Sequence, residues 1–72
     1  MEAKYMMNET FILERDDYRD FTNRVMILQS RNEEAPYIVE HDYIQDTFEV
    51  TLLDNRYTLQ TIMEKTQWRH IK

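Results

Sequence analysis

The chain has 72 residues, enough for one domain with a small core, because a chain this short buries only about 60% of the surface that its unfolded form exposes. It contains no cysteine, which excludes disulfides, thiolate metal ligands and a thiol nucleophile. It also contains no glycine, which excludes glycine-rich phosphate-binding loops. The formal net charge is −5 and 42% of the residues are hydrophobic, a composition typical of an acidic folded domain rather than a disordered tail.

The sequence has no features of a membrane or secreted protein. The longest apolar run, residues 25–28, is far shorter than the roughly 20 residues of a spanning helix, and the start of the chain lacks a signal-peptide pattern. The absence of cysteine fits a reducing compartment. We therefore expect a cytoplasmic protein without membrane contact.

The first half of the chain predicts an extended segment followed by a helix. Residues 9–14 fit either a strand or a backward extension of the helix, and we favour the strand. Residues 17–30 carry an apolar stripe at helical spacing: Tyr18, Phe21, Val25 and Leu28. Asp16 or Asp17 is the expected N-cap, and Asp20 and Arg24 lie one turn apart as an expected ion pair.

After Pro36 the hydrophobic period changes from helical to two. Residues 37–44 and 47–52 alternate as two strands, and residues 54–56 are the expected hairpin turn. A third strand over residues 57–63 is the preferred reading of the next segment. The alternative is an amphipathic helix with Leu59, Ile62 and Met63 on one side, continuing to Trp68.

These elements predict an α+β fold in a single domain over residues 1–72: one main helix packed on a three- or four-stranded antiparallel sheet. In that arrangement Val39, Val50, Leu52 and Leu59 face the helix. The opposite, open face of the sheet then presents Glu40, Asp42, Thr47, Glu49, Thr51, Thr58, Gln60 and Glu64.

The distribution of charge is the most informative feature for function. Residues 32–55 hold seven carboxylates and no Lys or Arg, while all nine basic residues lie in the flanking segments. Aromatic residues, which are favoured at protein interfaces, are interleaved with these carboxylates. The residues expected to bind a partner are Glu33, Glu34, Tyr37, Glu40, Asp42, Tyr43, Asp46, Glu49 and Asp54.

Reaction chemistry is weakly represented. Glu40, His41 and Asp42 are metal-ligand residue types, but adjacent strand residues point to opposite faces, so they favour neither a metal site nor an acid/base pair. Ser30, the only serine, is better explained as a helix-end residue, and His70 as a surface residue beside Trp68. We expect no cofactor, no metal and no catalytic activity, and the acidic balance disfavours direct nucleic-acid binding.

The sequence therefore predicts a small acidic inhibitor that binds a basic protein. The natural target is a nucleic-acid-handling enzyme or defence complex whose groove the inhibitor occupies as a DNA mimic. A virus-encoded anti-defence protein, such as an anti-CRISPR acting in the host cytoplasm, would have this size and charge. The alternative is a non-catalytic subunit or antitoxin-like neutraliser that folds as a homodimer or on its partner.

Overall fold

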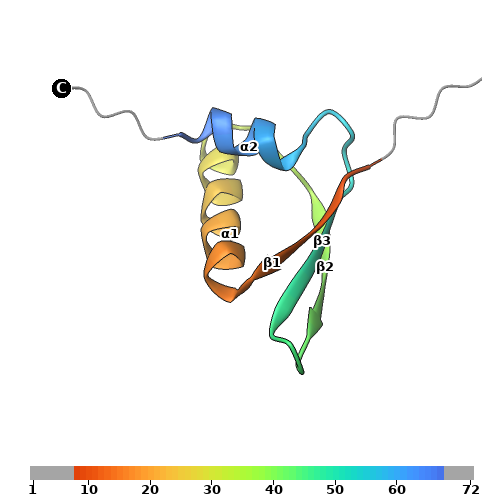
Figure 1. Ribbon diagram of the computed structural model, residues 1–72. Helices are drawn as coiled ribbons and strands as arrows, with labels where there is room; N and C mark the ends of the chain where they lie inside the picture. The colour runs from red at the N-terminus through yellow and green to blue at the C-terminus, as the bar shows by residue number, and fades with distance from the viewer. Residues whose placement is uncertain (1–7, 68–72) are drawn as a thin grey trace, which may run out of the picture.

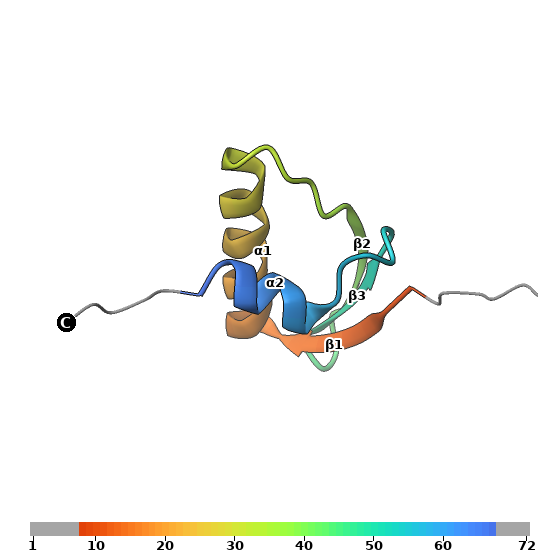
Figure 2. The same cartoon turned by 90° about the horizontal axis from the view of Figure 1, so that it is seen from above.

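The computed structural model describes residues 8–67, which form two helices and a three-stranded antiparallel sheet. The elements follow in the order β1 (Thr10–Glu14), α1 (Arg15–Ser30), β2 (Tyr37–Asp42), β3 (Thr47–Leu52) and α2 (Leu59–Lys65). The central strand is β3, with β1 and β2 at the edges. Helix α1 lies against one face of the sheet, and α2 crosses beside it (Figures 1 and 2). This arrangement confirms the predicted α+β class.

Helix α1 begins two residues earlier than the sequence pattern suggested. Its N-cap is Glu14, whose side chain makes no capping hydrogen bond, so the prediction of Asp16 or Asp17 as the cap was wrong. Both aspartates lie instead in the first turn, where their charges interact favourably with the positive end of the helix dipole. The expected pair is present, with Arg24 Nε donating to Asp20 Oδ2 at 2.7 Å.

The end of α1 shows how the chain turns without glycine. Asn32 adopts the left-handed region with φ of 66°, and the Asn32 and Glu33 amides donate to the carbonyls of Gln29 and Leu28. This is the pattern of a Schellman motif, in which asparagine replaces the usual glycine because its short polar side chain tolerates that conformation. The motif directs residues 33–36 back toward the sheet.

The core lies between α1, the sheet and α2. The predicted stripe of α1 faces inward, and Phe21 contacts Phe11 of β1 and Tyr37 of β2 in edge-to-face geometry with centroid separations of 5.7 and 5.0 Å. The buried hydrophobic residues are Phe21, Val25, Leu28, Ala35, Val50, Leu52 and Ile62. Burial of this set supplies most of the driving force for so small a fold.

The segment after β3 differs from the favoured prediction. Residues 57–63 do not form a strand; Leu59–Lys65 is helix α2, the alternative reading. Thr58 and Thr61 form a capping box, since Thr58 Oγ1 accepts from the Thr61 amide and Thr61 Oγ1 accepts from the Thr58 amide. The box satisfies free amides of the first turn, and Ile62 is then buried against α1.

Because residues 57–63 form no strand, two further predictions were wrong. Residues 54–56 are not a hairpin turn but link β3 to α2, and the β2–β3 hairpin closes through residues 43–46, where Asp46 takes a φ of 57°. Thr58, Gln60 and Glu64 therefore do not lie on the open face of the sheet, because their segment leaves the sheet before them. The prediction for residues 68–72 lies outside the described residues.

Candidate partner-binding surface

The side of the sheet that faces away from α1 is covered by no helix of residues 8–67, and we call it the open face (Figures 1 and 2). Side chains alternate along each strand, and Phe11, Val50 and Leu52 are on the helix side. The registers therefore place nine side chains on the open face: Thr10, Ile12, Glu14, Ile38, Glu40, Asp42, Thr47, Glu49 and Thr51. The three strand residues Glu40, Asp42 and Glu49 share this face, as predicted.

The central row of the open face runs Ile12, Glu49, Glu40 across β1, β3 and β2. Glu40 and Glu49 are direct cross-strand partners, and like charges in that position repel. Glu14 and Asp42 flank them in the next row, on either side of Thr47. No ion pair within residues 8–67 joins any of these four carboxylates to a Lys or Arg. Within the described part of the chain, the open face is thus an anionic surface without ion-pairing Lys or Arg.

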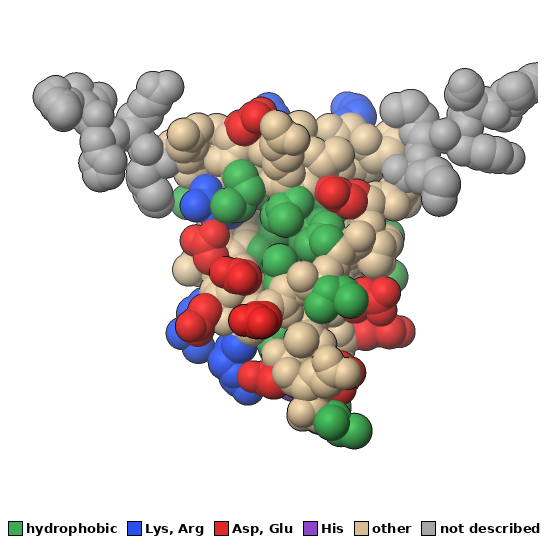
Figure 3. All heavy atoms as spheres, viewed as in Figure 1, with side chains coloured by type: hydrophobic (Ala, Val, Ile, Leu, Met, Phe, Trp, Pro, Cys, Tyr) green, Lys and Arg blue, Asp and Glu red, His purple; other side chains and the backbone are tan. Residues whose placement is uncertain are grey.

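Figure 3 shows where charged side chains lie around the fold. Carboxylates project at the right of the view, on the side of the strands away from α1, and others stand at the left, among the Lys and Arg side chains over α1. Hydrophobic side chains are visible between α1 and β1, below α2. The basic residues therefore lie mainly on the helical side of the domain.

Apolar side chains stand among the carboxylates. Ile12 is 66% exposed and Ile38 is 56% exposed, both on the open face. Two shallow hollows follow the rows of the sheet: one of about 300 Å³ reaches from Ile12 to Glu40 and Asp42, and one of about 210 Å³ lies between Thr10 and Ile38. The surface therefore offers both charge and apolar area to a partner.

The β2–β3 hairpin is fastened to the start of α1 by Asp46. Arg15 donates two hydrogen bonds to its carboxylate, Nε to Oδ2 at 2.8 Å and Nη2 to Oδ1 at 2.9 Å. His41 Nε2 lies 2.9 Å from Oδ1. These contacts, that of Arg15 first, hold the pKa of Asp46 below its usual value. Asp46 therefore has a structural partner already and positions the hairpin.

A column of rings supports the same end of the sheet on the helix side. The Phe48 ring stacks between Tyr18 and His41, with centroid separations of 4.2 Å on each side, and Tyr43 contacts His41 at 4.4 Å. His41 therefore points away from Glu40 and Asp42. Within residues 8–67 no three His, Asp or Glu side chains converge to hold a metal ion.

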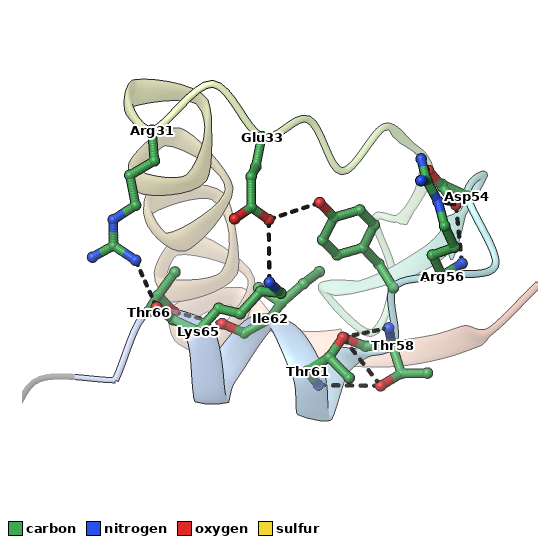
Figure 4. A network of polar contacts seen from close by, with 10 residues as sticks. Arg31, Glu33, Asp54, Arg56, Thr58, Thr61, Ile62, Lys65 and Thr66 are labelled. Carbon is green, nitrogen blue, oxygen red and sulfur yellow. Dashed lines mark hydrogen bonds and ion pairs between the residues drawn. The ribbon is translucent and has the colours of Figure 1, made fainter.

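Glu33 and Asp54 are also engaged inside the domain (Figure 4). Glu33 Oε1 accepts from the Tyr57 hydroxyl at 2.8 Å and pairs with Lys65 Nζ at 3.4 Å, and the Tyr57 hydrogen bond is the main cause of its lowered pKa. Asp54 accepts two hydrogen bonds from the Arg56 guanidinium, which lower its pKa in the same way. Glu33 therefore ties α2 and its preceding loop to the end of α1, whereas Asp54 orders that loop locally.

The three remaining predicted residues are placed differently from one another. Tyr37 faces the core and packs on Phe21; desolvation, with a smaller contribution from Tyr18, raises its pKa to about 12. Glu34 is exposed in the loop before β2. Tyr43 is 84% exposed at the tip of the hairpin. Of the nine predicted residues, the structure thus brings together Glu40, Asp42 and Glu49, with Tyr43 nearby on the same hairpin.

The sequence reasoning missed four residues that complete this surface. Glu14, Ile12 and Ile38 share the open face, and Ile44 is 94% exposed beside Tyr43. The alternation of Phe11 and Leu13 with Ile12 and Glu14 was the available signal, but the face of β1 could not be assigned without its pairing to β3. Trp68 and His70 lie outside the described residues.

Comparison with protein-family models, with curated proteins and with solved structures found no match to this chain. No helix within residues 8–67 is long and apolar enough to cross a membrane.

Proposed function

We propose that this protein is a small acidic inhibitor that binds a basic partner protein through the open face. The partner is a nucleic-acid-handling enzyme or defence complex, and the open face occupies the groove that normally holds a phosphate backbone. The protein itself would need no cofactor and would perform no catalysis. The observation that carries the proposal is the presence of four carboxylates on one sheet face without an ion pair to Lys or Arg of residues 8–67.

The cost of this arrangement supports a functional role. Like charges that face each other across two strands destabilise a sheet, so the repulsion between Glu40 and Glu49 lowers the stability of the fold. Solubility alone could be obtained from carboxylates on α1 or in loops, where the chain already has several. A basic groove would turn the repulsion into attraction and would speed association through long-range steering.

The area of the open face is too small for a stable interface unless the hairpin tip also contacts the partner. Three strands of this length present a rectangle on the order of 10 Å by 17 Å, well below the roughly 800 Å² that each partner buries in a standard interface. Tyr43 and Ile44 adjoin the face and are almost fully exposed. We therefore place the carboxylates in the groove and these two side chains against its apolar border.

A triple variant tests the proposal. Glu40→Gln, Asp42→Asn and Glu49→Gln together remove three charges from the open face while keeping side-chain size. Position 42 takes Asn rather than Gln, because the Asp42 carboxylate accepts from the Ile44 and Gln45 amides. The Asn side chain has the length of Asp, so its carbonyl oxygen can accept the same hydrogen bonds. The measurement is a pull-down of the tagged protein from host lysate at low and high salt, with the bound proteins identified by mass spectrometry.

The matched control is Asp16→Asn, Asp17→Asn and Glu64→Gln, which changes the net charge equally on the helical side. We expect wild type and control to retain a basic nucleic-acid enzyme at low salt and release it at high salt, and the open-face variant to lose it. Equal retention by both triple variants would refute the proposal.

Exposed apolar side chains on β2 and the hairpin favour a second candidate, a non-catalytic subunit or antitoxin-like neutraliser that associates through apolar burial, with itself or with a partner. Ile38, Tyr43 and Ile44 are the side chains concerned. This function predicts association that persists at high salt and, for a homodimer, a melting temperature that rises with protein concentration. Retention of a non-basic partner at both salts would support it.

A further inference from the structure

In the described part of the chain, the outer edge of β2 is an unpaired edge of the sheet. β2 pairs with β3 on one side only, and no strand within residues 8–67 lies along its other side. The free edge carries no proline or lysine in residues 37–42, two of the devices by which proteins block such edges. It therefore keeps backbone groups able to pair with another strand.

The hydrogen-bond pattern identifies those groups. The Leu53 amide donates to the Pro36 carbonyl at 2.9 Å, which makes positions 36 and 53 a hydrogen-bonded pair. In an antiparallel ladder such pairs alternate, so Ile38, Glu40 and Asp42 exchange hydrogen bonds with β3. The backbone N–H and C=O groups of Tyr37, Val39 and His41 consequently point outward at the free edge.

The helix side of the sheet is also incomplete along β2. The backbone of helix α1 lies close to β1 and β3, whereas α1 reaches β2 through the ring contact between Phe21 and Tyr37. Val50, the central-strand partner of Val39, is fully buried, whereas Val39 on the same side of the sheet remains 38% exposed. At the β1 edge, by contrast, the inward side chains Phe11 and Leu13 pack against the core. On β2, Tyr37 also packs against the core, so the core layer is left partly uncovered at Val39.

We propose that β2 receives a strand from the basic partner, which joins the sheet antiparallel as its fourth strand. This inference rests on the proposed function and specifies how the partner is held. Positions opposite Ile38, Glu40 and Asp42 form the close, non-hydrogen-bonded pairs of the new ladder. A fitting segment reads basic, polar, basic, apolar, apolar from the residue opposite Asp42 to the residue opposite Ile38.

Charge selects this occupant over a second copy of the chain. Antiparallel pairing of two β2 edges would bring the Glu40 and Asp42 carboxylates of both copies onto one sheet face, where they would repel each other. Lys or Arg at two positions separated by one residue would instead stand beside Glu40 and Asp42, whose side chains lie about 6.8 Å apart along the strand. The apolar residue opposite Val39 would cover the exposed part of the core layer.

The test uses two synthetic peptides with the full-length protein. One has the pattern above, with lysines as basic residues and valines as apolar residues; the other has the same charge but prolines at alternate positions, so that it cannot form a ladder. Binding is followed by the chemical shifts and hydrogen exchange of the protein's backbone amides at low salt. We expect the first peptide to slow exchange of the Val39 and His41 amides at least tenfold and the second to leave them unchanged.

Val39→Pro is the decisive variant, because it removes an outward amide without removing a bond to β3, and Val39→Ala is its matched control. We expect Val39→Pro to lose the first peptide and Val39→Ala to retain it, and exchange of the Glu40 amide reports whether the β2–β3 ladder survives each change. If the Glu40 amide loses its protection in Val39→Pro, that variant has lost the β2–β3 ladder. The test of strand addition is then the protection of the Val39 and His41 amides in the wild-type protein.

Each outcome has one meaning. Equal binding of both peptides without protection of Val39 and His41 overturns the strand addition and leaves the charge-based inhibitor in place. Binding of neither peptide overturns the proposed function, and with it this inference. Protection that appears without peptide and grows with protein concentration shows pairing with a second copy and overturns the assignment of the occupant.

Discussion

Glu40 of β2 and Glu49 of β3 stand directly opposite each other on the open face, and neither is ion-paired to Lys or Arg within residues 8–67. They form a hydrogen-bonded cross-strand pair, in which the two Cα atoms are about 5.5 Å apart. The two charges are therefore held close by the backbone that they destabilise. A sheet selected only for stability would place a basic or neutral residue at one of these positions.

Neutralising one member of this pair should stabilise the isolated protein. We expect Glu40→Gln to raise the free energy of unfolding by about 0.2 to 1 kcal/mol at low salt, because it removes cross-strand repulsion. The gain should shrink at high salt, where the repulsion is screened. Urea unfolding at two salt concentrations measures both effects. Glu34→Gln, in the exposed loop, is the control, and a loss of stability in Glu40→Gln would show that the repulsion is absent.

The Asp46 contacts predict how the fold responds to acid. Because the folded state lowers the pKa of Asp46, the carboxylate stabilises the protein above the unfolded-state pKa of about 3.9, and this contribution is lost as pH falls through the folded-state value. In the Arg15→Gln variant the pKa of Asp46 should rise, since the bond from Arg15 is the main cause of the shift. NMR titration of the Asp46 carboxyl measures it, and an ordinary pKa in the wild type would contradict the arrangement.

The capping box predicts the energetics of α2. Thr58→Ala should lower the free energy of unfolding by about 1 kcal/mol, because the Thr61 amide loses its acceptor. Thr58→Ser, which keeps the hydroxyl, should stay close to wild type. Thermal and urea unfolding give the comparison. Equal stability of the alanine and serine variants would mean that the box contributes nothing.

The raised pKa of Tyr37 predicts that the protein loses stability at high pH. Burial raises its pKa to about 12, against about 10 in the unfolded chain. Its contribution is therefore complete below pH 10 and is lost as pH rises toward 12. Tyr57, whose pKa is raised by its hydrogen bond to Glu33, adds to the same loss. Unfolding at increasing pH should show a weaker decline in Tyr37→Phe than in wild type; identical declines would contradict the prediction.

The elements with long, regular patterns could be predicted from the sequence. The stripe of α1 and the alternation of β2 and β3 were sufficient to place Glu40, Asp42 and Glu49 on one face. Helix α2 was only the alternative prediction, because it is seven residues long and its start depends on two threonines, where the usual capping box ends in Glu or Gln. A short amphipathic segment fits both periods, and tertiary contacts decide between them.

The internal partners of the acidic segment could not be predicted. Asp46 pairs with Arg15 across 31 positions of sequence, and Glu33 bonds Tyr57 across 24. Such pairs depend on how the elements pack, which charge counts along a segment do not describe. Three of the seven carboxylates of residues 32–55 therefore bond to side chains within the domain, namely Glu33, Asp46 and Asp54, and a fourth, Asp42, accepts from backbone amides of the hairpin.

The Arg15–Asp46 contact also has a consequence for binding kinetics. Arg15 opens α1 directly after β1, so one guanidinium connects the first helical turn to the hairpin that carries Tyr43 and Ile44. A hairpin held in this way arrives at a partner already in its bound shape, and the entropy lost on association falls mainly on individual side chains, about 0.5 to 1.5 kcal/mol for each one immobilised. Weakening the Arg15–Asp46 contact should therefore slow association and lower affinity, although Arg15 is not part of the proposed binding surface.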